Sequence, residues 1–241
     1  MTKNETSISL PFMIMGVAFC VCLIASNLFE MKVFRATSWL TLTGGFLIFP
    51  ISYILNDCIT EVWGFRRARF VIWLGFAMNF FVMALAGLVA ILPAETPGSD
   101  QAFREVFSFA PQIVAASLLA FLTGSFLNAY IMSRMKRSAK GKGRFIQYFS
   151  LRAILSTLIG ESADSLVFFP LAFYFFPLLF SGGPVLSGML LLKVMVTQVL
   201  AKTLFEVILL PITIQVVQYV KRHDDCDIYD DNITYNPFSK S

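Results

Sequence analysis

The third apolar block of the chain, residues 70–92, reads FVIWLGFAMNFFVMALAGLVAIL. It contains no charged side chain, and apolar residues occupy every face of a helix drawn through it. The hydrocarbon core of a bilayer is about 30 Å thick, so a spanning helix needs about 20 residues at about 1.5 Å each. The block therefore predicts a transmembrane helix.

Five similar blocks flank this one, at residues 10–29, 39–55, 109–132, 151–180 and 185–220. Hydrophobic residues make up 57% of the chain and charged residues 14%, against about 25% charged residues in soluble domains. Strands of a membrane barrel would alternate apolar and polar residues. We therefore expect an all-α fold, a polytopic bundle of six transmembrane helices forming one domain over residues 1–220. A polar, acidic cytoplasmic tail is expected over residues 221–241, loosely attached to the bundle.

The first block lacks a small-residue cleavage site and is followed at once by Glu30 and Lys32, so we expect a retained helix. With the N-terminus in the cytoplasm, fourteen of the 19 basic residues lie on that side and three on the other, and Lys193 and Lys202 lie inside the last block. The positive-inside rule then places both termini in the cytoplasm. Topology and anionic lipids explain the net charge of +4, so we expect no nucleic-acid partner.

Ionisable side chains within the apolar blocks are the candidate functional residues, because each costs at least about 2.5–3.5 kcal/mol in hydrocarbon. The second block closes with the stretch NDCITE, in which a spacing of four puts Asp57 and Glu61 on one helix face, beside Asn56. A shared face suggests one site. The basic run at 66–69 leaves a second interpretation open for Glu61, that it marks the membrane edge.

The fifth and sixth blocks carry further charged residues at helical spacing. Glu161 and Asp164 are three residues apart and therefore neighbours on one face. Two carboxylates this close in a low dielectric need a cation or a shared proton. Lys202, followed four residues later by Glu206, is the natural counter-ion. Substrate contact and an ion pair that only stabilises the bundle both remain open for Lys202.

Enzyme chemistry has little support in these blocks. The single histidine, His223, lies in the predicted tail, and the four cysteines show no zinc-ligand spacing. A paired-aspartate protease using Asp57 and Asp164 would need local motifs that the chain lacks. We expect no enzyme, no metal and no other cofactor.

Three stretches together resemble the queuosine precursor transporter family of vitamin-uptake-like bacterial membrane proteins. They are DCITEVWGF from Asp57 with the basic run at 66–69, the segment from Arg152 through Ser156 to Asp164, and the segment from Lys202 to Glu206 ahead of a proline. The resemblance covers residues from about 11 to 219. It implies six helices arranged like the substrate-binding subunits of energy-coupling-factor importers, in the bacterial cytoplasmic (inner) membrane.

The resemblance also implies a substrate class, the 7-deazaguanine precursors of the modified tRNA nucleoside queuosine, such as queuine. The alternative is a substrate-binding subunit of a multi-component vitamin or nucleobase importer. A deazaguanine presents adjacent N–H donors that a carboxylate can accept, and aromatic rings can cover its face. We therefore expect Asp164 and Glu161 to bind the base edge and Lys202 to balance charge. The full set of candidate substrate-binding residues is Asn56, Asp57, Glu61, Glu161, Asp164, Lys202 and Glu206. Membrane lipids are the other expected partners, and a homodimer stays open.

Overall fold

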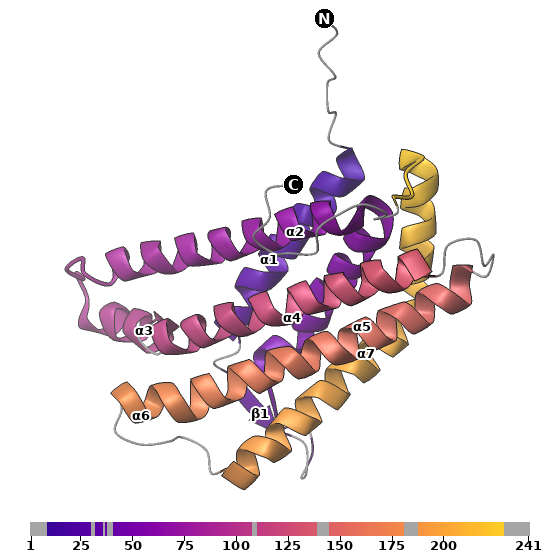
Figure 1. Ribbon diagram of the computed structural model, residues 1–241. Coiled ribbons are helices and arrows are strands. Elements are labelled where there is room, and N and C mark those ends of the chain that lie inside the picture. The colour runs from indigo at the N-terminus through magenta and orange to yellow at the C-terminus, as the bar shows by residue number, and fades with distance from the viewer. Residues whose placement is uncertain are drawn as a thin grey trace, which may run out of the picture.

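The computed structural model describes residues 9–29, 32–35, 37, 41–107, 110–138, 145–180 and 188–228. Long helices dominate this part of the chain (Figure 1). Five helical stretches among the described residues are long and apolar enough to cross a membrane. They belong to α1 (Leu10–Phe29), α2 (Phe49–Val89), α4 (Ala110–Ser138), α5 (Phe145–Pro170) and α7 (Gly188–Asp224). The prediction of a polytopic helical membrane bundle is confirmed.

Helix α2 accounts for two of the six predicted membrane spans. Its 41 residues would measure roughly 60 Å if straight, about twice the hydrocarbon thickness. The helix is instead broken at Gly64, where φ is 80° and ψ is 170°. One arm precedes Gly64, and the other contains most of the apolar block at 70–92. The bundle therefore consists of α1, the two arms of α2, α4, α5 and α7.

The backbone conformation at Gly64 is one that side-chain-bearing residues essentially never adopt. Gly64→Ala is therefore expected to lower the free energy of unfolding by about 1–3 kcal/mol, because the substitution strains the break between the two arms. Gly87→Ala is the matched control in the same helix, since a Cβ there would meet nothing within 4 Å. Thermal unfolding of both variants in detergent measures the difference. Equal melting temperatures would contradict this account of the break.

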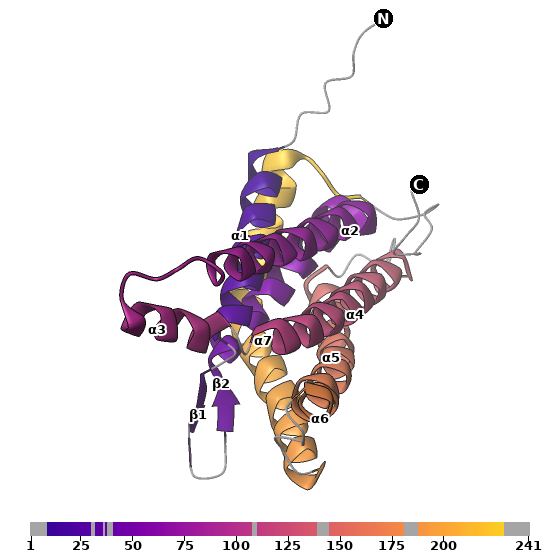
Figure 2. The same cartoon turned by 90° about the vertical axis from the view of Figure 1, so that its left-hand side faces the viewer.

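The second predicted block, residues 39–55, begins before the helix that the structure shows there. Residues 41–43 form the strand β2 (Thr41–Thr43), which pairs antiparallel with β1 (Val33–Arg35), and η1 (Gly44–Leu47) is a short 3-10 helix. β-Branched threonines favour a strand, and two adjacent glycines disfavour an α-helix. Figure 2 shows this hairpin at the end of the molecule away from the start of α1. The span itself begins at Phe49.

Two shorter helical pieces complete the described structure. Helix α3 (Pro97–Phe107) lies between the second arm of α2 and α4. After Pro170, which ends α5, the chain forms one π-helical stretch, η2 (Leu171–Phe175), and then α6 (Phe176–Phe180). Proline lacks the N–H that would continue the α-helical ladder, which explains the change of helix type there.

Helix α1 shows how the bundle divides lipid-facing from buried surface. Phe12, Phe19 and Leu23 lie in the apolar core, together with residues of α2 and α4. Met13 and Val17 lie on the opposite face and are 53% and 60% exposed, as expected of side chains that contact lipid. The exposed apolar side chains are thus consistent with a membrane environment.

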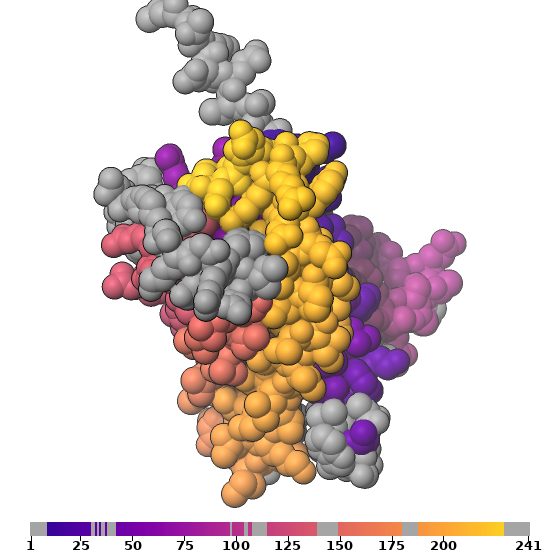
Figure 3. Space-filling view, turned by 90° about the vertical axis from the view of Figure 1, so that its right-hand side faces the viewer, coloured from indigo at the N-terminus to yellow at the C-terminus, as the bar shows by residue number. Residues whose placement is uncertain are grey.

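The start of α1 and the end of α7 lie at the same end of the bundle (Figure 2). Ser9, which precedes α1, lies near Asp224, the last residue of α7. Figure 3 shows α7 running the height of one face of the molecule toward that end. Arg67, in the basic run that follows Gly64, lies over the Phe12 ring near the start of α1, so this run lies at the same end of the bundle.

Candidate functional site

Lys202 of α7 lies against two carboxyl groups of α5 in the interior of the bundle. Its Nζ is 3.0 Å from Oε2 of Glu161 and 3.9 Å from Oδ2 of Asp164. The same ammonium group lies 4.0 Å from the centroid of the Phe49 ring, at the start of α2. All four side chains are buried. Three helices therefore bring one cation, two carboxyl groups and an aromatic face together within the membrane-spanning region.

A second pair of carboxyl groups lies one helical turn away along α7. Glu206 lies beside Asp57 of α2 and Thr157 of α5. Asn128 of α4 donates to Oδ1 of Asp57 over 2.7 Å. We call Asp57, Glu161, Asp164, Lys202 and Glu206 the intramembrane cluster.

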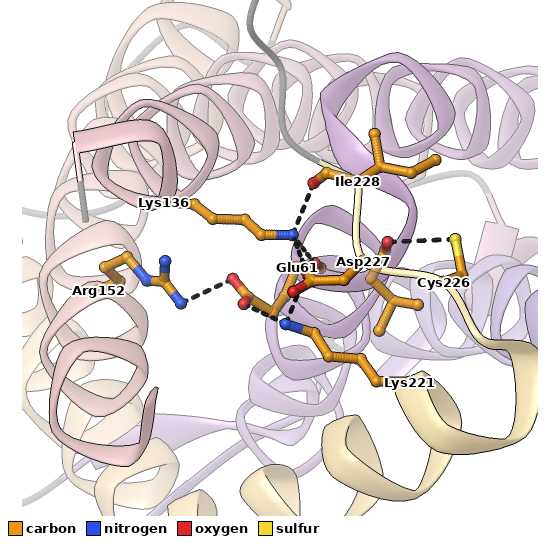
Figure 4. Close-up of polar contacts among 8 residues, drawn as sticks. Glu61, Lys136, Arg152, Lys221, Cys226, Asp227 and Ile228 are labelled. Atoms are coloured by element: carbon orange, nitrogen blue, oxygen red, sulfur yellow. Dashed lines mark hydrogen bonds and ion pairs between the residues drawn. The ribbon is translucent and has the colours of Figure 1, made fainter. Parts of the chain in front are cut away.

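Glu61 belongs to a different group of charges, at the end of the bundle where α7 ends (Figure 4). Its Oε2 is 2.9 Å from Nη2 of Arg152, and its Oε1 is 2.8 Å from Nζ of Lys221. Lys221 also lies 2.9 Å from Asp227, and Lys136 lies 2.7 Å from the same carboxylate. We call these five residues the end cluster. It joins α2, α4, α5, α7 and the residues that follow α7.

Asp227 lies beyond the membrane-spanning helices and is partly exposed. Burial by itself would raise the pKa of its carboxyl group. The hydrogen bonds from Lys136 and Lys221 outweigh that effect and hold the pKa below its ordinary value. Asp227 is therefore an ionised partner of both lysines near neutral pH.

A comparison with known protein families matches residues 43–216 to a family described as "Putative vitamin uptake transporter". The matched range contains the whole intramembrane cluster and most of the end cluster. The chain belongs to this family. No solved structure matches the chain.

Three curated bacterial relatives extend the comparison. The chain is 28% identical over 135 residues to the "Probable queuosine precursor transporter" of Bacillus subtilis (strain 168), covering 56% of this chain and 57% of the relative. It is 26% identical over 164 residues to the protein of the same name from Haemophilus influenzae, covering 62% and 64%. It is 28% identical over 137 residues to the "Queuosine precursor transporter" of Escherichia coli (strain K12), covering 55% of each. The matches thus span between about half and two thirds of these relatives.

The structure separates Asp57 from Glu61, although both lie on one face of α2. Arg152 and Lys221 contact the two carboxylate oxygens of Glu61, whereas Asp57 accepts a hydrogen bond from Asn128 and lies beside Glu206. The predicted single site is therefore two adjacent groups. Asn56 faces the backbone of α4, where its Nδ2 lies 3.4 Å from the Ser125 carbonyl oxygen. The substrate-binding role of these residues stays a prediction.

Sequence reasoning missed Tyr53 as a candidate. Its hydroxyl is buried and has no hydrogen-bond partner among the described residues. A Cβ placed on Gly124 would collide with that hydroxyl and come within 2.8 Å of Cβ of Asp164, so the phenol lies beside the intramembrane cluster. Helical spacing in the sequence could have identified this residue, because Tyr53 precedes Asp57 by one helical turn on α2. An unused buried hydroxyl is suited to a polar ligand.

The described residues contain no group of three or more His, Cys, Asp or Glu side chains placed to hold a metal ion. Cys20, Cys22, Cys58 and Cys226 are free thiols. The chemistry that the cluster offers is hydrogen bonding and charge pairing by carboxyl, ammonium and phenol groups.

Proposed function

We propose that this chain imports 7-deazaguanine precursors of queuosine across the bacterial cytoplasmic membrane. The observation that supports this most directly is the buried group of Lys202, Glu161 and Asp164 beside the Phe49 ring. Such a group is expensive inside a membrane and usually belongs to a substrate or ion path. The chain belongs to a vitamin uptake family, and its curated relatives carry the name queuosine precursor transporter.

The proposed binding mode follows from the groups in the cluster. A deazaguanine edge presents neighbouring N–H donors, and Asp164 and Glu161 supply the acceptors. The Phe49 ring is placed to cover the face of a planar ligand. Lys202 balances the carboxylates when the ligand is absent and can turn to a ligand oxygen when it is present. The proposed site, or the path to it, is completed by Asp57, Glu206, Asn56 and Glu61.

Asp164→Asn is expected to reduce uptake at least about tenfold, because it replaces an acceptor of the base edge with an amide that also carries donors. Initial uptake rates, normalised to the amount of inserted protein, measure the effect. Glu95→Gln makes the equivalent chemical change at an exposed position outside both clusters and should leave uptake unchanged. Wild-type uptake by Asp164→Asn would remove this residue from the binding site.

The proposed orientation has both termini in the cytoplasm. It is supported by the excess of basic residues at the end of the bundle where α1 starts and α7 ends. A transmembrane domain over residues 1–220 and a cytoplasmic tail over 221–241 belong to the same proposal, as does transport without catalysis of a bond change. A homodimer remains a prediction that cross-linking in membranes can test. Residues 229–241 lie outside the described residues.

The function is tested in bacteria that cannot make queuosine precursors and lack their own transporter. Cells expressing this chain are given queuine or an earlier deazaguanine base, and queuosine in tRNA is measured. Restored queuosine with the chain alone is the expected result. Restoration only when the energising proteins of a multi-component importer are supplied would favour the substrate-binding subunit instead. No restoration under either condition, with confirmed membrane insertion, would overturn the proposed substrate.

A further inference from the structure

Residues 225–228 fold back over the end of the bundle after α7 has ended (Figure 4). Asp225 takes a left-handed conformation with φ of 45°, which turns the chain out of the helix. Asp227 then binds Lys136 and Lys221, and the Ile228 carbonyl accepts a hydrogen bond of 2.6 Å from Lys136. The predicted loose tail is thus attached to the bundle over these residues, because their charges and backbone groups are paired there.

The break at Gly64 explains why this segment finds partners on α2. A helix that ends leaves its last carbonyl groups without intrahelical donors. Near the break, the Val62 carbonyl accepts a hydrogen bond of 3.1 Å from the Ile228 backbone N–H and a weaker one from the Cys226 thiol. The Glu61 carbonyl accepts one from the Lys136 ammonium group. The segment at 225–228 and Lys136 therefore cap the end of the first α2 arm from outside.

These contacts lie directly beyond the intramembrane cluster. Glu61 follows Asp57 by one helical turn, and Lys221 and Arg152 bind the carboxylate of Glu61 from α7 and α5. The same three helices carry the intramembrane cluster. Any solute that leaves the cluster toward this end has to pass between helices that the end cluster ties together. The family match ends at residue 216, so Lys221 and residues 225–228 lie outside it.

We propose that residues 225–228 form a latch that keeps this end of the transport path closed. Asp227 holds Lys136 and Lys221 in place, and Lys221 in turn helps to hold Glu61 against Arg152. Release of the latch loosens the ties between α2, α5 and α7 and opens the cluster to the aqueous phase on this side. The inference rests on the proposed transport function, and it adds the element that gates one side of the same site.

Accessibility of the cluster to a water-soluble thiol reagent tests the latch without any substrate. The parent is the full chain with Thr157→Cys as the reporter thiol. Cys226 is changed to serine, which keeps a donor for the Val62 carbonyl. The other three cysteines are changed to alanine. Thr157 is buried and lies beside Glu206. A membrane-impermeant charged methanethiosulfonate is added to membrane vesicles of each orientation, and the modified fraction is followed by mass spectrometry.

Asp227→Asn is expected to raise the modification rate from the latch side at least about tenfold and to leave the rate from the other side unchanged. Asp227→Glu keeps the charge and should behave like the parent, as should Glu95→Gln at an exposed position away from the latch. Equal latch-side rates for Asp227→Asn and the parent, with equal melting temperatures, would overturn the proposal. Because no deazaguanine is used, this outcome is independent of whether the proposed substrate is correct.

Discussion

Replacing Lys202 with methionine is expected to abolish uptake and to lower the free energy of unfolding by about 3–5 kcal/mol. Lys202 is the ammonium group that contacts both Glu161 and Asp164, and all three side chains are buried. Methionine keeps most of the side-chain volume and removes the charge. The carboxylates then lose their shared cation in a low-dielectric interior, which is far more costly than losing an exposed ion pair.

A second variant separates loss of function from loss of stability. Lys202→Met combined with Glu161→Gln removes one charge of each sign and should recover most of the melting temperature, but not uptake. Lys193→Met is the control, because Lys193 lies on the same helix and is exposed. Uptake rates and thermal unfolding in detergent are measured for all three. Uptake near the wild-type rate in Lys202→Met would contradict a role for this residue in transport.

Replacing Gly124 with alanine is expected to lower uptake about 100-fold and to destabilise the bundle by about 1–3 kcal/mol. An added Cβ would lie 2.8 Å from Cβ of Asp164 and 2.9 Å from the carbonyl oxygen of Gly160, and it would collide with the Tyr53 hydroxyl. The Gly160 carbonyl belongs to the backbone of α5, so it cannot move aside as the end of a flexible side chain can. Helices α4 and α5 must therefore separate, which displaces Asp164 and Tyr53 together.

The control for this variant is Gly87→Ala, where the added Cβ meets nothing within 4 Å. It should match or slightly exceed the wild-type melting temperature, since alanine favours a helix by up to about 1 kcal/mol over glycine. Tyr53→Phe removes the hydroxyl involved in the clash. If tight packing causes the defect, Gly124→Ala should reduce uptake and melting temperature less in the Tyr53→Phe background than in the wild type. No difference between Gly124→Ala and Gly87→Ala would contradict the close approach of α4, α5 and Tyr53.

The membrane-spanning blocks were predictable because the bilayer imposes a length and a composition on every span. The predicted helices were wrong where a stretch of similar hydrophobicity forms a different kind of secondary structure. Residues 41–47 are apolar enough to extend a helix, yet threonines and adjacent glycines place a strand and a 3-10 helix there. The connection between the second and third spans is a break at a single glycine, Gly64, and not a loop. Hydrophobicity carries no information about that conformation.

The candidate site, too, was predictable in part. Spacings of three and four residues correctly indicated that Glu161 neighbours Asp164 and that Lys202 is their counter-ion. Contacts between helices depend on how each helix is rotated about its axis, which spacing along one chain segment does not determine. The proximity of Asp57 to Glu206 and the pairing of Glu61 with Arg152 therefore appeared only in the structure. Charges after α7 suggested a solvated tail, whereas Asp227 pairs with two lysines of the bundle.

The most direct test of the central claim is uptake by the purified chain in liposomes that contain no other protein. The substrate is a radiolabelled 7-deazaguanine base, and Lys202→Met liposomes with the same protein content are the control. The account predicts time-dependent, saturable accumulation inside wild-type liposomes and none above the protein-free level in the variant. Wild-type liposomes that accumulate no more base than the variant, although the wild-type protein is folded, would contradict it.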